Sequence, residues 1–175
     1  MPSEPTSHWV LLALSRYEAP LLRYATAIVG SAQAADVVQD TFLRLCNQDQ
    51  AAVEPHLRAW LFTVCRNRAL DVRRDKRHVE SVAEVDEIMP DNHPGPSEAL
   101  ERREAMRRVL GALDTLPERQ REAVLLKFSG DLSYQEIAEV LGTSVSNVGF
   151  LLHTALRALR EHVEKKDRET ERRSR

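Results

Sequence analysis

The chain has 175 residues, of which 42% are hydrophobic and 30% are charged, with few aromatic residues and few glycines, a composition that favours a soluble helical protein of one medium domain or two small ones. No apolar run approaches the roughly 20 residues that a membrane-spanning helix needs, and no secretion signal is visible at the N-terminus, so the sequence predicts a cytoplasmic protein without membrane insertion. The net charge of −2 argues at first against a nucleic-acid partner, but the charges are distributed unevenly.

Two amphipathic helices are predicted at the start of the chain. Residues 7–29 carry apolar side chains at helical spacing, with Pro20 predicting a kink or two shorter helices and Gly30 predicting the end. Ser31 is expected to cap a second helix over residues 31–46. The buried face of this second helix is expected to hold Ala35, Val38, Phe42 and Leu45.

The opposite face of the second predicted helix is polar and carries Asp36, Gln39 and Asp40. Carboxylates near the start of a helix interact favourably with its dipole, so a solvated face explains them. An acidic docking surface for a basic partner helix is the alternative. The residues alone favour the solvated face.

A polar loop over residues 47–54 precedes the longest helix pattern of this half, which Pro55 is expected to open. Its apolar stripe is expected to hold Leu57, Trp60, Leu61, Val64, Cys65, Leu70 and Val72. Residues 66–77 contain six Lys or Arg and only two acidic residues. Cations suit a helix C-terminus for dipole reasons alone, but this density exceeds what capping needs, so a phosphate-binding face is preferred. Cys46 and Cys65 are expected to be buried free thiols, with a redox pair as the alternative.

The middle of the chain predicts a flexible acidic linker over residues 79–99. Residues 78–100 contain six acidic residues and no Lys or Arg, and four Pro or Gly residues lie between positions 90 and 96. The linker separates two small helical domains. Beyond it, residues 97–113 and 117–130 predict two further helices, the second with Val124, Leu125 and Phe128 buried.

Residues 133–160 predict two helices joined by a glycine turn. Ser133 and Glu136 form a capping-box pattern, and Gly142 lies where the chain needs a positive φ. Thr143 or Ser144 is expected to cap the second helix.

Three positions of this segment, Ala138, Gly142 and Val148, have the spacing of a helix-turn-helix, a DNA-reading unit. An ordinary αα-hairpin is the alternative. Residues 163–175 alternate in charge, which predicts a fraying helix or a disordered tail.

The ordered set of DVVQDTFLRL, LRAWLFTVCRNRALDVRR, an acidic linker and LPERQREAVLLKFSGDLSYQEIAEVLG resembles the extracytoplasmic-function (ECF) sigma factors of bacterial RNA polymerase, over about residues 17–77 and 109–160. The resemblance implies an all-α fold: region 2 over residues 1–78, the acidic linker over 79–99, a winged-helix-like region 4 without a sheet over 100–162, and a charged tail over 163–175. It implies a non-enzymatic subunit that recognises −35 and −10 promoter DNA and captures the melted non-template strand, without cofactor or metal.

The resemblance also implies roles for individual residues. Asp36, Gln39 and Asp40 would dock on the β′ clamp helices of core RNA polymerase, which reverses the preference for a solvated face. The −10 element would be read by loop 47–54 together with Arg66, Asn67, Arg68, Asp71, Arg73, Arg74, Lys76 and Arg77. Basic groups would hold the backbone, and an Asn offers both a donor and an acceptor to an unstacked base. The C-terminal domain would contact the β flap, and family analogy suggests an anti-sigma factor, which no residue here identifies.

One stretch departs from the family pattern. The second helix of the helix-turn-helix has Gly149, Leu151 and Thr154 where the family commonly carries Lys or Arg, which predicts weaker and less salt-sensitive binding. The remaining candidates for −35 contacts are Ser144, Ser146, Asn147, Phe150, His153, Thr154 and Arg157. The preceding helix offers Arg119, Arg121 and Lys127 as sources of the missing charge.

Other functions fit the sequence less well. A polymerase-independent helix-turn-helix regulator leaves the basic block 66–77 and the acidic face of residues 31–46 without a role. An enzyme is disfavoured, because the sequence shows no phosphate loop, no metal-spaced Cys/His set and no nucleophile-and-base motif. A pure interaction adaptor is the least favoured alternative.

Overall fold

The computed structural model describes residues 5–79 and 111–173. Its elements are all helical, which confirms the predicted all-α class for these ranges. In chain order they are α1 (Pro5–Val29), α2 (Ser31–Cys46), α3 (Gln50–Val53), the 3-10 helix η1 (Glu54–His56), α4 (Leu57–Val79), α6 (Glu118–Ser129), α7 (Tyr134–Leu141) and α8 (Val145–Arg173). The predicted linker and most of the predicted helix 97–113 lie outside the described residues.

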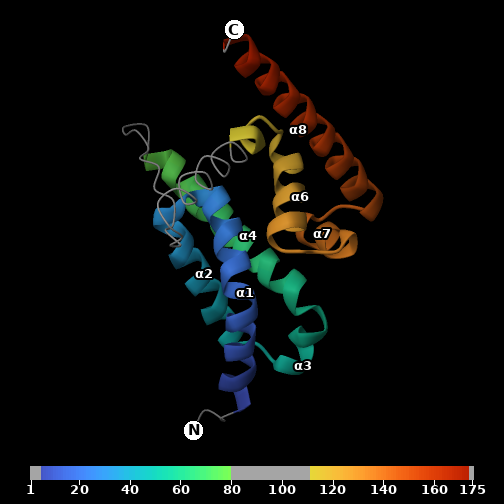
Figure 1. The fold of residues 1–175 in the computed structure, drawn as a ribbon. Coiled ribbons are helices and arrows are strands. Elements are labelled where there is room, and N and C mark those ends of the chain that lie inside the picture. Colours follow the sequence, from blue (N-terminus) through green and yellow to red (C-terminus); the bar gives the residue numbers. More distant parts are fainter. Residues whose placement is uncertain (1–4, 80–110, 174–175) are drawn as a thin grey trace.

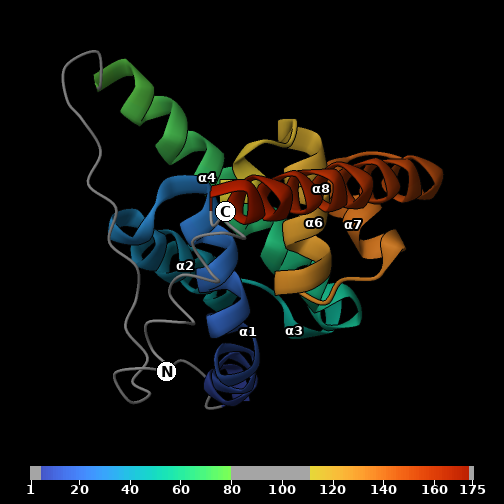
Figure 2. The same cartoon turned by 45° about the horizontal axis from the view of Figure 1, so that its top comes forward.

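The N-terminal domain is built from α1, α2 and α4, which pack along one another (Figure 1). Leu21, Tyr24, Leu45, Leu61 and Phe62 are fully buried at their centre. The rings of Tyr24 and Phe62 meet edge to face, with centroids 5.5 Å apart. In two views the C-terminal end of α4 projects past α1 and α2 (Figures 1 and 2).

Several local predictions for this domain are wrong. Of the two alternatives for Pro20, the division into two shorter helices is wrong, because Pro20 lies inside one α-helix, α1. Gly30, with φ 83°, is the N-cap of α2, so Ser31 is already helical and does not cap. On α2, Val38, Phe42 and Leu45 are buried as predicted, but Ala35 is exposed, and Ala34 and Val37 are buried in addition.

The segment after α2 is more ordered than a loop. Asp49 caps the short helix α3, and Pro55 lies in η1, so α4 begins only at Leu57. The two cysteines also differ, because Cys65 is buried and Cys46 is exposed. Burial raises the pKa of the Cys65 thiol to about 12, although a hydrogen bond with Thr41 opposes the shift.

The C-terminal domain has the predicted helix-turn-helix. The Ser133 hydroxyl accepts from the Glu136 amide at 3.2 Å, and the Glu136 carboxylate accepts from the Ser133 amide at 2.7 Å, which confirms the capping box. Gly142 adopts φ 60° and ψ 48°, the left-handed conformation that ends α7. Val148 is fully buried, as the close crossing of α7 and α8 requires.

One side chain of this domain differs from expectation. Phe128 is 64% exposed, because α6 turns Glu122, Ala123, Val124, Leu125 and Leu126 inward. Of the two alternatives predicted for the tail, the structure has the helix: residues 163–173 continue α8, whose end projects beyond the rest of the domain (Figure 1).

The two domains are packed against each other, which the sequence did not indicate. Helix α4 contacts α7, and α1 contacts α6 (Figures 1 and 2). Buried residues of both domains form one continuous apolar cluster. At the junction, the backbone of Gly130 lies so close to Phe62 of α4 that an added Cβ would stand 2.7 Å from the ring.

Candidate nucleic-acid and polymerase interface

The outer face of α2 presents the predicted polymerase-binding residues. Asp36 and Gln39 are exposed, whereas Asp40 is only partly exposed. The Oδ2 atom of Asp40 accepts a hydrogen bond from Nε of Arg68 at 2.7 Å, which ties α2 to α4. The structure therefore links one predicted polymerase contact directly to one predicted DNA contact.

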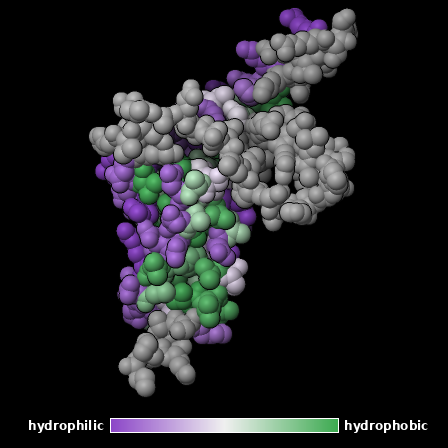
Figure 3. Space-filling model, turned by 90° about the vertical axis from the view of Figure 1, so that its left-hand side faces the viewer, coloured by the Kyte–Doolittle hydropathy of each residue, from purple (hydrophilic) through white to green (hydrophobic). Residues whose placement is uncertain are grey.

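Apolar side chains are also exposed on this domain. Figure 3 shows hydrophobic patches between hydrophilic ones on its surface, and α1 and α2 expose Leu11, Leu12 and Leu43 by more than half. Protein interfaces combine apolar contact with a polar rim, so this mixture suits a docking surface.

The arginines of α4 were expected to form a free phosphate-binding face, but those with described side chains have carboxylate partners. Nε and Nη2 of Arg66 donate to the two carboxylate oxygens of Glu122, at 3.1 and 2.9 Å. Arg73 donates to Glu118, and Arg74 to Asp71. Asn67 is exposed and forms no side-chain hydrogen bond within the described ranges, so it remains accessible to a base. The side chains of Lys76 and Arg77 lie outside the described part.

The Arg66–Glu122 pair is the most enclosed of these contacts, with the side chains 18% and 5% exposed. Burial by itself lowers the pKa of the Arg66 guanidinium, but the hydrogen bonds and negative charge of Glu122 outweigh this and raise it. Glu122 is the last residue of the polar stretch 118–122 and directly precedes the apolar residues 123–126. Its place in the sequence therefore does not distinguish it from an exposed glutamate, and only the tertiary structure reveals the pair.

Helix α8 exposes most of the predicted −35 residues. Ser144, Ser146, Asn147, Phe150, His153 and Arg157 are exposed. Thr154 is partly buried, and its hydroxyl donates to the Phe150 carbonyl at 2.8 Å, so it is less available to a base edge.

The cations expected to compensate for the charge-poor α8 are engaged elsewhere. Arg119 donates to the Leu141 carbonyl at 2.7 Å, Arg121 to the Leu113 carbonyl at 3.0 Å, and Lys127 to the Leu132 carbonyl at 3.1 Å. They satisfy carbonyl groups at helix ends and in the loop after α6, where the helical hydrogen-bond pattern leaves carbonyls without backbone partners. The prediction that they supply phosphate contacts is therefore weakened.

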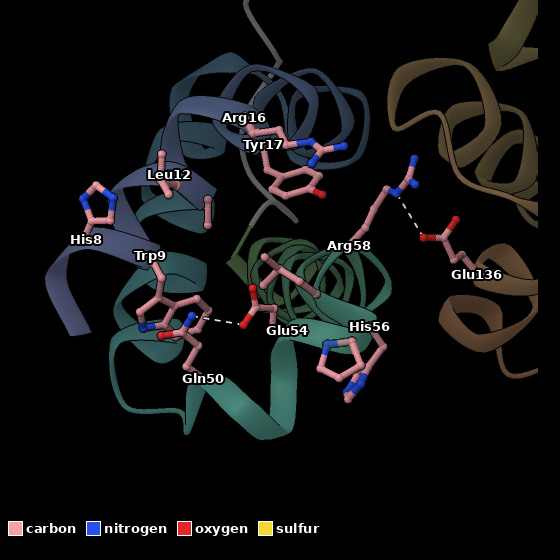
Figure 4. Close-up of a pocket in the computed structure, with 13 residues that line it drawn as sticks. His8, Trp9, Leu12, Arg16, Tyr17, Gln50, Glu54, His56, Arg58 and Glu136 are labelled. Atoms are coloured by element: carbon pink, nitrogen blue, oxygen red, sulfur yellow. Dashed lines mark hydrogen bonds and ion pairs between the residues drawn. The ribbon is translucent and has the colours of Figure 1, made fainter. Parts of the chain in front are cut away.

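A cavity of about 680 Å³ opens between the N-terminal part of α1, the α3–η1 segment and the C-terminal domain (Figure 4). Gln50 and Glu54 line it from the segment that the sequence assigns to −10 recognition. Arg58 and Glu136 close one side, with Nε of Arg58 3.0 Å from Oε1 of Glu136. Among the described residues there is no cluster of three His, Cys, Asp or Glu side chains that could hold a metal ion. None of the described helices is long and apolar enough to span a bilayer.

Comparison with known proteins identifies the family. The Sigma-70 region 2 family matches residues 13–79, and the Sigma-70 region 4 family matches residues 106–159. The ECF RNA polymerase sigma factor SigL of Mycobacterium tuberculosis is 36% identical over 149 residues, which cover 82% of each chain. The chain belongs to the ECF sigma factors. As a sigma factor it binds core RNA polymerase and directs promoter-specific transcription initiation, which favours this function over the polymerase-independent regulator.

Further relatives of this sigma factor agree. EcfG of Rhodopseudomonas palustris is 37% identical over 133 residues, covering 74% of this chain and 71% of the relative. Among solved structures, CnrH in complex with the cytosolic domain of CnrY matches with a TM-score of 0.66 and 24% identity, covering 91% of this chain and 90% of that one. RpoE of Bartonella quintana, in complex with the anti-sigma factor NepR, matches with a TM-score of 0.65 and 24% identity, covering 93% and 98%. The likeness in fold thus extends over both domains.

Proposed function

We propose that this sigma factor docks on the β′ clamp helices through the outer face of α2 and melts the −10 element with α4 and residues 47–54. The observation that carries this proposal is Asn67, an exposed amide between Arg66 and Arg68 near the middle of α4. The amide can hydrogen-bond an unstacked base while the arginines hold phosphates. Helix α8 then contacts −35 DNA, with the C-terminal domain against the β flap.

The domain assignment is part of the same proposal. Residues 1–78 serve as region 2, residues 100–162 as region 4, and residues 79–99 as the linker between them. The protein works in the cytoplasm, where polymerase and chromosome meet, and it catalyses no reaction of its own, because capture of a flipped base offsets the few kcal/mol of unstacking. An anti-sigma factor is a proposed partner, since two structural relatives are complexes with other chains.

Docking is tested with charge reversal on α2. Asp36→Lys is expected to abolish binding to core polymerase in a pull-down, because it places a cation where a basic helix is expected to approach. Asp36 is exposed, so the circular dichroism spectrum should stay unchanged. Asp40→Lys is a less clean variant, because it also breaks the bond to Arg68. Retained binding by Asp36→Lys would place the interface elsewhere.

Promoter melting is tested with Asn67→Ala. Run-off transcription and permanganate reactivity of the −10 region should fall far more than core binding, because the substitution removes base contacts and leaves the α2 face intact. Gln135→Ala removes an exposed amide from α7, which is assigned no part in melting, and serves as the amide control. Equal loss of melting and core binding would show that Asn67 has a structural role.

A further inference from the structure

Three arginine–glutamate pairs join the two domains, and every arginine comes from α4. They are Arg58–Glu136, Arg66–Glu122 and Arg73–Glu118, called here the latch pairs. Arg66 lies eight residues after Arg58 and seven before Arg73, two helical turns in each direction, so the three guanidinium groups share one side of α4. The C-terminal domain therefore covers that side with carboxylates.

The central pair leaves no room for DNA. Glu122 uses both carboxylate oxygens to bind Arg66, and its side chain is 5% exposed. A phosphate also binds arginine through two oxygens in a fork geometry, so Glu122 occupies the position that a phosphate would take. Arg66 cannot hold both ligands.

Apolar and backbone contacts reinforce the latch pairs. Gly130 packs against the fully buried Phe62, and Nη2 of Arg23 donates to the Ser129 carbonyl at 3.2 Å. Nη1 of Arg58 donates to the Asp131 carbonyl at 2.6 Å. The turn after α6, residues 129–131, is thus held by both α1 and α4.

The third carboxylate faces the cavity described above. Glu136 forms its wall opposite Gln50 and Glu54 (Figure 4). Because Glu136 pairs with Arg58, this arginine on the cavity wall is not free to hold a phosphate beside the segment proposed to capture the −10 base.

From this arrangement we infer that the free sigma factor is self-inhibited: the C-terminal domain masks the DNA-binding side of α4 with carboxylates that imitate promoter phosphates. Opening the domains exchanges Glu122 and Glu118 for DNA phosphates. This inference rests on the proposed role of α4 in DNA binding. Because closure and DNA binding exclude each other, each weakens the other by the same factor.

Domain separation can be measured without DNA. The exposed Cys46 in α2 and an introduced Glu161→Cys in the exposed part of α8 accept a fluorescent donor and acceptor. The buried Cys65 thiol has its pKa raised to about 12, so it holds little thiolate and labels slowly. Energy transfer in the full-length chain then reports the distance between the domains.

Glu122→Gln keeps the shape of the side chain and removes its charge. We expect lower energy transfer and tighter binding of a fluorescein-labelled mixed-sequence single-stranded DNA, by about 5–150-fold, the usual range for coupled sites. Glu139→Gln removes the same charge from an exposed position on α7 and should change neither readout. Unchanged energy transfer in Glu122→Gln, or opening without a gain in DNA affinity, would overturn the inference.

A second variant, Gly130→Ala, changes none of the six residues that form the latch pairs. Gly130 has φ −99°, which alanine adopts freely, but its Cβ would stand 2.5 Å from Cδ1 of Leu132 and 2.7 Å from the ring of Phe62. Because the Phe62 ring is fully buried in the other domain, Gly130→Ala should push the turn after α6 away from α4 and wedge the domains apart. Gly111→Ala, whose Cβ meets nothing within 4 Å, is the control. Gly130→Ala should likewise lower energy transfer and tighten DNA binding, and failure of either change counts against the latch. Wild-type protein that closes normally but supports no run-off transcription would instead refute the proposed function.

Discussion

Helices α4 and α8 differ in a way that neither charge nor exposure alone describes. The C-terminal half of α4 is rich in arginine, yet its arginines with described side chains have carboxylate partners, two of them in the other domain. Helix α8 is poor in charge at its N-terminal end, yet its polar side chains are exposed. The more strongly charged surface, on α4, is therefore covered by carboxylate partners, and the less charged surface, on α8, is exposed to solvent.

The largest difference between the two helices is expected when an arginine is removed from each, with Arg66 removed from α4 and Arg157 from α8. Arg66→Ala leaves Glu122 charged, buried and unpaired, which should cost about 3–5 kcal/mol of unfolding free energy in urea denaturation. Arg157→Ala on α8 removes an exposed arginine whose partner Glu161 is 3.8 Å away, and should cost at most about 0.5 kcal/mol. Replacing both members, Arg66→Met with Glu122→Leu, should recover most of the loss. If the double variant is as unstable as the single one, the pair is not the cause.

Adding a cation to α8 should make its exposed surface more like the arginine-rich surface of α4. Gly149→Arg places a Cβ 3.8 Å from Tyr134, an ordinary contact, and removes a glycine from a helix, so it should stabilise the domain by up to about 1 kcal/mol. The added cation should raise the slope of log affinity against log salt for −35 duplex DNA by about one. Gly149→Gln should match the gain in stability and leave the slope unchanged. A slope that stays the same with Arg would place position 149 away from DNA.

A smaller effect should appear in acid. Burial raises the pKa of Glu136, but the hydrogen bonds from Ser133 and the charge of Arg58 lower it more, so the folded value lies below the ordinary one. The stabilisation is therefore complete above the unfolded pKa of about 4.3 and is lost as pH falls through the folded value. Unfolding curves at successive pH values should show that wild type loses more stability over this window than Glu136→Gln. Parallel losses would show that the carboxylate is not responsible.

The sequence predicts each domain well and their association poorly. Ser133, Glu136, Gly142 and Val148 act through neighbours a few residues away, so spacing alone places the helix-turn-helix. The partner of Arg66 lies 56 residues away, beyond the linker, and no periodicity links the two. Phe128 shows a related limit, because helical spacing permits two inward faces and only tertiary packing selects one.

The boundaries in the N-terminal domain fail for local reasons. Asp49 is a good N-cap, and it starts a short helix inside a segment whose polarity suggests a loop. The fixed φ of Pro55 is compatible with a 3-10 turn as well as with the first turn of an α-helix. A proline therefore indicates that helical structure begins nearby, but it does not distinguish η1 from α4.

Gly130 has a genetic consequence. Any glycine codon becomes an alanine codon through one base substitution, so the steric wedge against Phe62 is always one mutation away. A selection for strains that transcribe this factor's promoters without their signal should return changes at position 130, a residue assigned no contact with DNA or polymerase. Such alleles would be dominant, because an open factor competes for core polymerase whether or not closed copies are present.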